Sequence, residues 1–171
     1  RMVKLHRETG IVCHDRIDDL PGDIDTIVLF HVLEHVPRPW ELLRELVVRF
    51  PRADRVVIEV PNGREVLVSL FDVPAYRANH YSADHLYYFD NATLGAVARR
   101  AGLQILVDSQ MQRYPLGNTM GWIADGRGGG QNRWRLFSDP VFHAAYQQVL
   151  ADAGAADSVF LICAPAVGTV A

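Results

Sequence analysis

Residues 25–39 read Asp25-Thr-Ile-Val-Leu-Phe-His-Val-Leu-Glu-His-Val-Pro-Arg-Pro39, and they set the architecture that we predict for the whole chain. The four apolar residues at 27–30 are typical of a strand that is covered on both faces. His31, Glu34 and His35 follow directly, and ligands of open α/β sheets bind at the carboxyl ends of strands. We therefore predict a buried strand that ends in an acidic, imidazole-bearing corner beside a binding crevice.

The same corner matches the H-x-x-E-H string of a group of zinc proteases, because His31, Glu34 and His35 have that spacing. Such a site needs both histidines on one face of a continuing helix, four residues apart. Here a β-like run leads into the string. Pro37 and Pro39 follow almost at once, and proline disfavours helix at the residue before it. We therefore predict no metal site, and a zinc hydrolase is the least favoured interpretation.

The composition is that of an ordinary globular protein. The chain has 171 residues, of which 49% are hydrophobic, and we predict a single domain over residues 1–171. Its 17 Lys and Arg against 20 Asp and Glu give a net charge of −3, which argues against nucleic acid and anionic membranes as partners. No run approaches the ~20 apolar residues of a membrane span. Cys13 and Cys163 lack metal-site spacing and predict buried thiols in a reducing, cytoplasmic location.

Strand and helix patterns alternate along the chain. We predict strands at 10–13, 25–30, 55–60, 103–107 and 158–164, and helices at 40–50, 65–71, 91–101 and 140–153. Asn91 is the predicted N-cap of the third helix, and Gly102 its C′ residue. The glycine-rich stretch 111–138 is predicted to be loop, within an irregular insert at about 110–150. The alternation predicts a three-layer α/β fold, with a mainly parallel sheet, helices on both faces and an antiparallel last strand.

Four pieces of the chain, in order, resemble the C-terminal two-thirds of a class I S-adenosylmethionine-dependent methyltransferase. They are Asp15-Arg-Ile-Asp-Asp-Leu-Pro21, the run 25–35, Val57-Ile-Glu-Val-Pro-Asn62, and His85-Leu-Tyr-Tyr-Phe89 with Leu94 and Ala101-Gly-Leu103. The resemblance spans about residues 10–110 and implies a Rossmann-like methyltransferase fold that is incomplete at its N-terminus.

The family's glycine-rich cofactor turn has no counterpart in this chain. The family's sheet order, 3-2-1-4-5-7-6, would leave the strand at 25–30 with an open edge, and open apolar edges pair or aggregate. The resemblance therefore implies that the natural polypeptide is longer, that the first strand repacks, or that another chain covers this edge, for example a second copy in a homo-oligomer.

The resemblance also assigns a cofactor-binding set. Asp15 and Arg16 match the position at which the family contacts adenine, although a solvated polar turn explains them equally well. Phe30, His31 and Val32 match the strand corner that lines the cleft for S-adenosylmethionine.

The acceptor side carries its own candidates. His85 is the candidate base, because a histidine takes up protons near neutrality, and Asp84 beside it would orient the ring. His35 is the alternative base. The candidate substrate-binding residues are Glu34, Asn62, His80 and Tyr81. A structural hydrogen bond or simple packing remains an alternative role for each of these side chains.

Two functions follow from these observations. The first is transfer of a methyl group from S-adenosylmethionine to a small polar acceptor, for example a sugar nucleotide, by a truncated or partial enzyme. The alternative is a non-catalytic, methyltransferase-like binding or assembly module that has lost cofactor binding. The missing glycine-rich turn favours the alternative, whereas the histidine-rich segments favour the enzyme.

Overall fold

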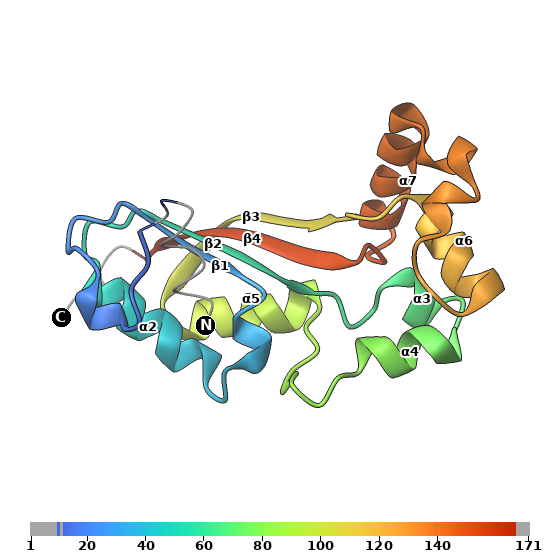
Figure 1. The fold of residues 1–171 in the computed structure, drawn as a ribbon. Coiled ribbons are helices and arrows are strands. Elements are labelled where there is room, and N and C mark those ends of the chain that lie inside the picture. The colour runs from blue at the N-terminus through green and yellow to red at the C-terminus, as the bar shows by residue number, and fades with distance from the viewer. Residues whose placement is uncertain (1–9, 11, 167–171) are drawn as a thin grey trace.

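The computed structural model of the protein describes residue 10 and residues 12–166. Its sheet has four strands in the order β1-β2-β4-β3 (Figure 1). These are β1 (Thr26–Phe30), β2 (Arg55–Pro61), β3 (Leu103–Met111) and β4 (Ser158–Pro165). β1 pairs with β2 in parallel, and β4 is antiparallel to both of its neighbours. Three strands therefore run one way and the last runs against them, which confirms the predicted fold class.

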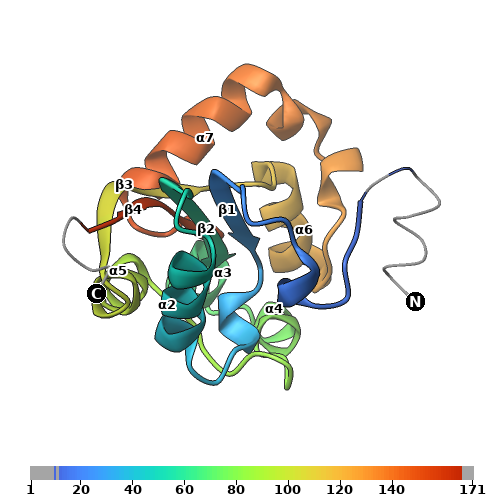
Figure 2. The ribbon, with the colours of Figure 1, turned by 90° about the vertical axis from the view of Figure 1, so that its left-hand side faces the viewer.

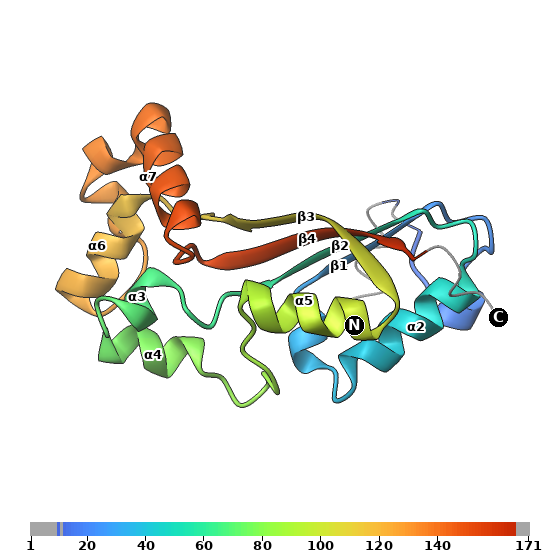
Figure 3. The same cartoon turned by 180° about the vertical axis from the view of Figure 1, so that it is seen from behind.

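Helices flank this sheet in two groups. The helical segments are η1 (Ile17–Asp19), η2 (Leu33–His35), α2 (Pro39–Arg49), α3 (Val66–Ser69), α4 (Pro74–His80), α5 (Asn91–Arg100), α6 (Leu116–Asp125), η3 (Gly130–Asn132), η4 (Arg135–Ser138) and α7 (Pro140–Asp152). α2 and α5 lie side by side along one face of the sheet (Figures 1 and 3). α3, α4, α6 and α7 gather at the end of the sheet away from α2 (Figures 1 and 3), and Figure 2 looks along the sheet from the opposite end.

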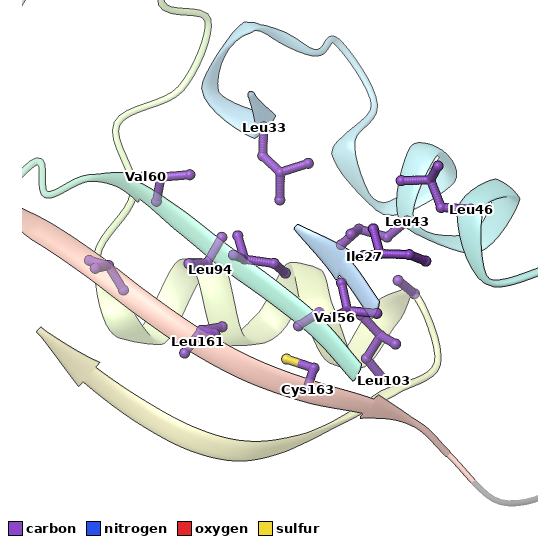
Figure 4. Packing of buried hydrophobic residues seen from close by; sticks show 14 of the residues in the cluster. Ile27, Leu33, Leu43, Leu46, Val56, Val60, Leu94, Leu103, Leu161 and Cys163 are labelled. Atoms are coloured by element: carbon purple, nitrogen blue, oxygen red, sulfur yellow. The ribbon is translucent and has the colours of Figure 1, made fainter. Parts of the chain in front are cut away.

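The main core lies between the sheet and the pair α2 and α5 (Figure 4). Strand register aligns the inward side chains: Ile27 pairs with Val56, and Ile58 with Leu161. Leu43 of α2 and Leu94 from α5 complete the layer and are fully buried. Each such side chain contributes about 1.5–3 kcal/mol through burial. The alternation along the strands therefore fixes which face receives the helices.

β1 forms one edge of the described sheet, as the family's strand order predicted. In the described part of the chain it is covered on one face rather than on both. Val28 and Phe30, on the face opposite the helix pair, are each 51% exposed. No helix in the structure, over residues 10 and 12–166, is long and apolar enough to cross a membrane.

The N-cap of α5 lies one residue earlier than predicted. Asp90 Oδ1 accepts a hydrogen bond from Thr93 N–H at 2.8 Å, and Thr93 Oγ1 accepts one from Asp90 N–H at 2.9 Å. This reciprocal pair is a capping box, which satisfies two N–H groups at once. Asn91 instead donates to Ser109 O and Asp108 Oδ1. Gly102 does end the helix with φ +83°.

Two predicted elements are wrong. Gly10, Val12 and Cys13 do not form a strand, and residue 11 lies outside the described residues. The predicted loop at 111–138 contains α6. Glycine disfavours helix, but here it permits contact: a Cβ at Gly121 would lie 2.9 Å from the backbone nitrogen of Gly130. Close backbone packing therefore outweighs the low helix propensity, and the insert is largely helical rather than irregular.

Candidate functional site

The chain turns after β1 at a residue whose backbone has a left-handed conformation. His31 has φ +53°, a conformation that histidine tolerates better than bulkier residues do. Its N–H still donates to Glu59 O at 2.9 Å, so the sheet hydrogen bonding continues to the turn. The turn brings His31 Nδ1 to 3.4 Å from Glu34 Oε1. η2 is a single 3₁₀ turn, so the continuing helix that a protease-type H-x-x-E-H site requires is absent from these described residues.

A second segment, residues 84–87, is tied to this corner by hydrogen bonds. Leu86 N–H donates to Glu34 O at 2.8 Å, and His35 Nδ1 donates to Asp84 O, also at 2.8 Å. The rings of His35 and His85 meet edge to face, with centroids 4.8 Å apart. Glu34, a predicted substrate-binding residue, and the two candidate bases His35 and His85 therefore form one cluster.

Two buried carboxylates lie at this corner, one within the cluster and one beside it. Glu34 is 1% exposed and Glu59 is 4% exposed. Glu59 forms an ion pair with Arg113, and His31 Nε2 lies 3.8 Å from its Oε1. Among the described residues, neither carboxylate oxygen of Glu34 has a hydrogen-bond partner. Because burial of a carboxylate without hydrogen bonds is costly, a nearby positive charge or a bound ligand would stabilise Glu34.

A pocket of about 390 Å³ opens beside the corner, between the end of the sheet and the insert. It is lined by His31, Pro61, Glu65, Leu67, Tyr76, Asn79, His80, His85, Gln112, Arg113, Tyr114, Asn118, Thr119, Trp122, Gly128, Asp157 and Ser158. Seven of these residues, from Gln112 to Gly128, come from the predicted insert, so the insert forms one wall of the pocket.

Titratable groups in this pocket have shifted pKa values. Burial raises the pKa of Glu65 from 4.5 to about 7, and the charge of Asp157 adds to this effect. Burial also raises the pKa of Asp157 and of Tyr76. Burial, with a smaller contribution from the charge of His85, lowers the pKa of His80 from 6.5 to about 4. At neutral pH Glu65 is therefore partly protonated and His80 is neutral, a combination typical of functional sites.

The remaining predicted residues are distributed around the pocket rather than in it. Asn62 is fully buried and donates to Ala156 O at 2.7 Å, which is a structural role. Tyr81 packs against Tyr88. Asp84 is exposed, and its contact with a histidine is the hydrogen bond from His35 to its backbone carbonyl.

Of the cofactor candidates, only His31 is among the residues that line the pocket. Asp15 and Arg16 precede η1, and Arg16 pairs with Asp18 at the surface. Phe30 and Val32 flank His31 without lining the pocket. Of the candidates, the pocket thus brings together His31, His80 and His85.

Sequence reasoning missed Glu65 and Asp157. Glu65 precedes the apolar run Val66-Leu-Val68 and resembles an ordinary polar residue at a helix start, and Asp157 resembles a turn residue before a strand. Their unusual pKa values come from burial by segments far apart in the chain, for which the local sequence holds no signal.

Comparisons with known proteins agree with the fold. The family model described as a methyltransferase domain matches residues 3–107. A chain of the complex between the Haloferax volcanii Trm112 methyltransferase activator and a methyltransferase is 13% identical, with a TM-score of 0.55 over 96% of this chain and 67% of that one. No curated protein matches.

Two further solved structures are similar at lower TM-scores. A SAM-dependent methyltransferase from Archaeoglobus fulgidus is 17% identical, with a TM-score of 0.44 over 95% of this chain and 80% of that one. The [4+2]-cyclase SpnF is 17% identical, with a TM-score of 0.48 over 97% of this chain and 62% of that one. At such identities a likeness concerns the fold alone.

Proposed function

This chain belongs to the methyltransferase-domain family, with the fold of class I S-adenosylmethionine-dependent enzymes, and from that premise we propose that it serves methyl transfer to a small polar acceptor. One observation supports the proposal most strongly. His31, at the corner after β1, and Pro61, at the end of the parallel neighbouring strand β2, line the same pocket. Such carboxyl-end crevices are where open α/β sheets bind ligands.

The methyl donor would supply an electrophilic methyl group on a positively charged sulfur. Phe30, His31 and Val32, with Asp15 and Arg16, are the residues that we propose for its adenosyl part. The half-exposed ring of Phe30 fits this role, because an aromatic face stacks on a base. The described residues supply only the adenosyl side of a cofactor cleft, because no glycine-rich turn joins a strand to a helix within them.

The pocket suits a hydroxyl-rich acceptor, such as the sugar of a nucleotide. Its wall carries neutral hydrogen-bonding groups from Tyr76, Asn118 and Thr119 beside the carboxyl groups of Glu65 and Asp157. When the acceptor atom bonds to the methyl carbon, the carbon–sulfur bond breaks and the acceptor proton must go to a base. His85 is the base that the sequence suggests, with His35 as its alternative. Glu65 is a further one, because its pKa of about 7 suits proton transfer at neutral pH.

Binding of S-adenosylhomocysteine tests this function by calorimetry. Titrations use this chain and a form that carries any residues encoded before Arg1. We expect binding by the longer form, and Phe30→Ala to weaken it about tenfold, or ~1.4 kcal/mol. Phe71→Ala is the matched control, because Phe71 is 48% exposed and lies outside the proposed cleft. In an active form, His85→Ala should lower turnover far more than cofactor affinity.

If neither form binds the cofactor product, the enzyme proposal fails in favour of an assembly module. One observation favours the assembly module: Val28 and Phe30, on the edge strand β1, are half exposed. A partner protein or a second copy of the chain would cover them, and analytical ultracentrifugation of the purified chain detects a second copy. We also propose that the protein is located in the cytoplasm. The buried free thiol of Cys163 is consistent with such a reducing compartment.

A further inference from the structure

We propose that Glu34, His35 and His85 bind a divalent transition-metal cation of the zinc type. One ligand atom from each lies within 4.8 Å of the other two. This inference goes beyond methyl transfer, because it requires no methyl donor. It also differs from the protease-type site considered above, which would pair His31 with His35 on one helix.

One pair of ligand atoms in the cluster is close to the spacing of a tetrahedral site. Two ligands at about 2.0–2.1 Å from zinc are about 3.3 Å apart at a tetrahedral angle. Glu34 Oε1 and His35 Nε2 are 3.8 Å apart, so this pair needs to approach by only a few tenths of an ångström. The ligand atom of His85 lies within 4.8 Å of the other two, so a side-chain rotation that moves it by up to about 1.5 Å would complete the triangle of ligands.

The tautomer of His35 is already the one that a metal requires. Its Nδ1 lies 2.8 Å from Asp84 O, and a carbonyl oxygen can only accept, so Nδ1 carries the hydrogen. In the neutral ring the lone pair is then on Nε2, which faces Glu34. Metal-binding histidines almost always donate their second ring N–H to a carbonyl or carboxylate in this way.

Glu34 supplies an independent observation. Its side chain is 99% buried, and both of its oxygens lack a hydrogen-bond partner among the described residues. His31 and His35 approach Oε1 only to 3.4 and 3.8 Å. An ionised carboxylate in such surroundings is costly unless a cation neutralises it, and a bound metal does so directly.

The segments that carry the ligands are held in place without a metal. Leu86 N–H donates to Glu34 O, and Tyr87 Oη donates to Pro37 O at 2.7 Å. The cluster is therefore a largely preorganised site rather than three side chains on mobile loops.

The position of the site suggests what the cation does. His85 lines the pocket, so a metal with three protein ligands would turn its open position towards an acceptor. A hydroxyl bound there loses its proton more easily. His85 would then be a ligand, and Glu65 would remain as the group that takes up the proton.

Calorimetric titration of the chelator-treated, untagged protein with Zn²⁺, without any methyl donor, tests this inference. We expect one cation per chain. Glu34→Gln and His85→Ala should each weaken binding by at least about tenfold. His143→Ala, on α7 and outside the cluster, is the control and should leave the affinity unchanged.

A second readout uses Co²⁺, whose visible absorption reports ligand number and geometry. We expect a tetrahedral spectrum for the wild type and its loss in Glu34→Gln, a substitution that preserves side-chain shape. Absence of wild-type binding, or equal affinity in the cluster variants, would overturn the metal site. Since S-adenosylhomocysteine is absent from both experiments, their failure is separate from failure of the proposed methyl transfer.

Discussion

The buried carboxyl group of Glu65 should make the free energy of unfolding depend measurably on pH. Its pKa rises from 4.5 to about 7 on folding, chiefly because burial disfavours the charged form. A raised folded pKa means that the folded state holds the proton more tightly. The stabilisation is therefore fully present below pH 4.5 and is lost as the pH rises through 7. At about 1.4 kcal/mol per pH unit between these values, the loss approaches roughly 3 kcal/mol.

His80 opposes this effect in the same pocket. Its pKa falls from 6.5 to about 4 on folding, again chiefly because of burial. The unfolded chain then binds more protons between pH 4 and 6.5, so His80 makes the protein more stable as the pH rises through this window. The two contributions are of similar size, and in the wild type they largely cancel between pH 4.5 and 6.5.

Glu65→Gln separates the two groups, because it removes one titration with little change of shape. We expect the free energy of unfolding of the variant, relative to the wild type, to rise by about 3 kcal/mol between pH 4.5 and pH 8. Urea denaturation at a series of pH values measures this difference. Glu41→Gln, on the exposed face of α2 and beside Arg38, is the control and should differ from the wild type by less than about 1 kcal/mol throughout.

A constant difference between Glu65→Gln and the wild type, within about 0.5 kcal/mol at every pH, would refute the reasoning. Glu65 would then titrate normally, and it would lose its proposed part in proton transfer. Asp157, whose pKa burial also raises, titrates in both proteins, so it enters the difference only through the effect of its charge on Glu65.

Three further predictions concern stability and reactivity. Asp90→Ala should lower the free energy of unfolding by about 1 kcal/mol by removing the α5 cap, while Asp90→Ser should retain most of it in chemical denaturation. Gly130→Ala would bring a Cβ to 2.2 Å from Gly117 O and should cost about 1–3 kcal/mol. In Gly22→Ala, where the nearest atom is 3.8 Å away, the change should stay within about 0.5 kcal/mol. Burial raises the pKa of Cys163 to about 11, so mass spectrometry should detect its alkylation at pH 8 only after denaturation.

The sequence alone determined the elements whose signals are local. The apolar run before His31 predicted β1, the spacing of apolar residues after Pro39 predicted α2, and the order of motifs predicted the fold. These succeeded because strand and helix periodicity, and proline's restricted backbone, act within a few residues.

Only the tertiary structure decided which of these residues act together. Glu34 and His35 meet His85 because backbone hydrogen bonds join segments about fifty positions apart. Glu65 acquires its pKa from burial and from the charge of Asp157, near the other end of the chain, whereas Gly121 of α6 packs against the backbone of Gly130 just after the helix. Burial, charge interactions and close backbone contact depend on distances in space. For residues far apart in the sequence, those distances are set only when the chain folds.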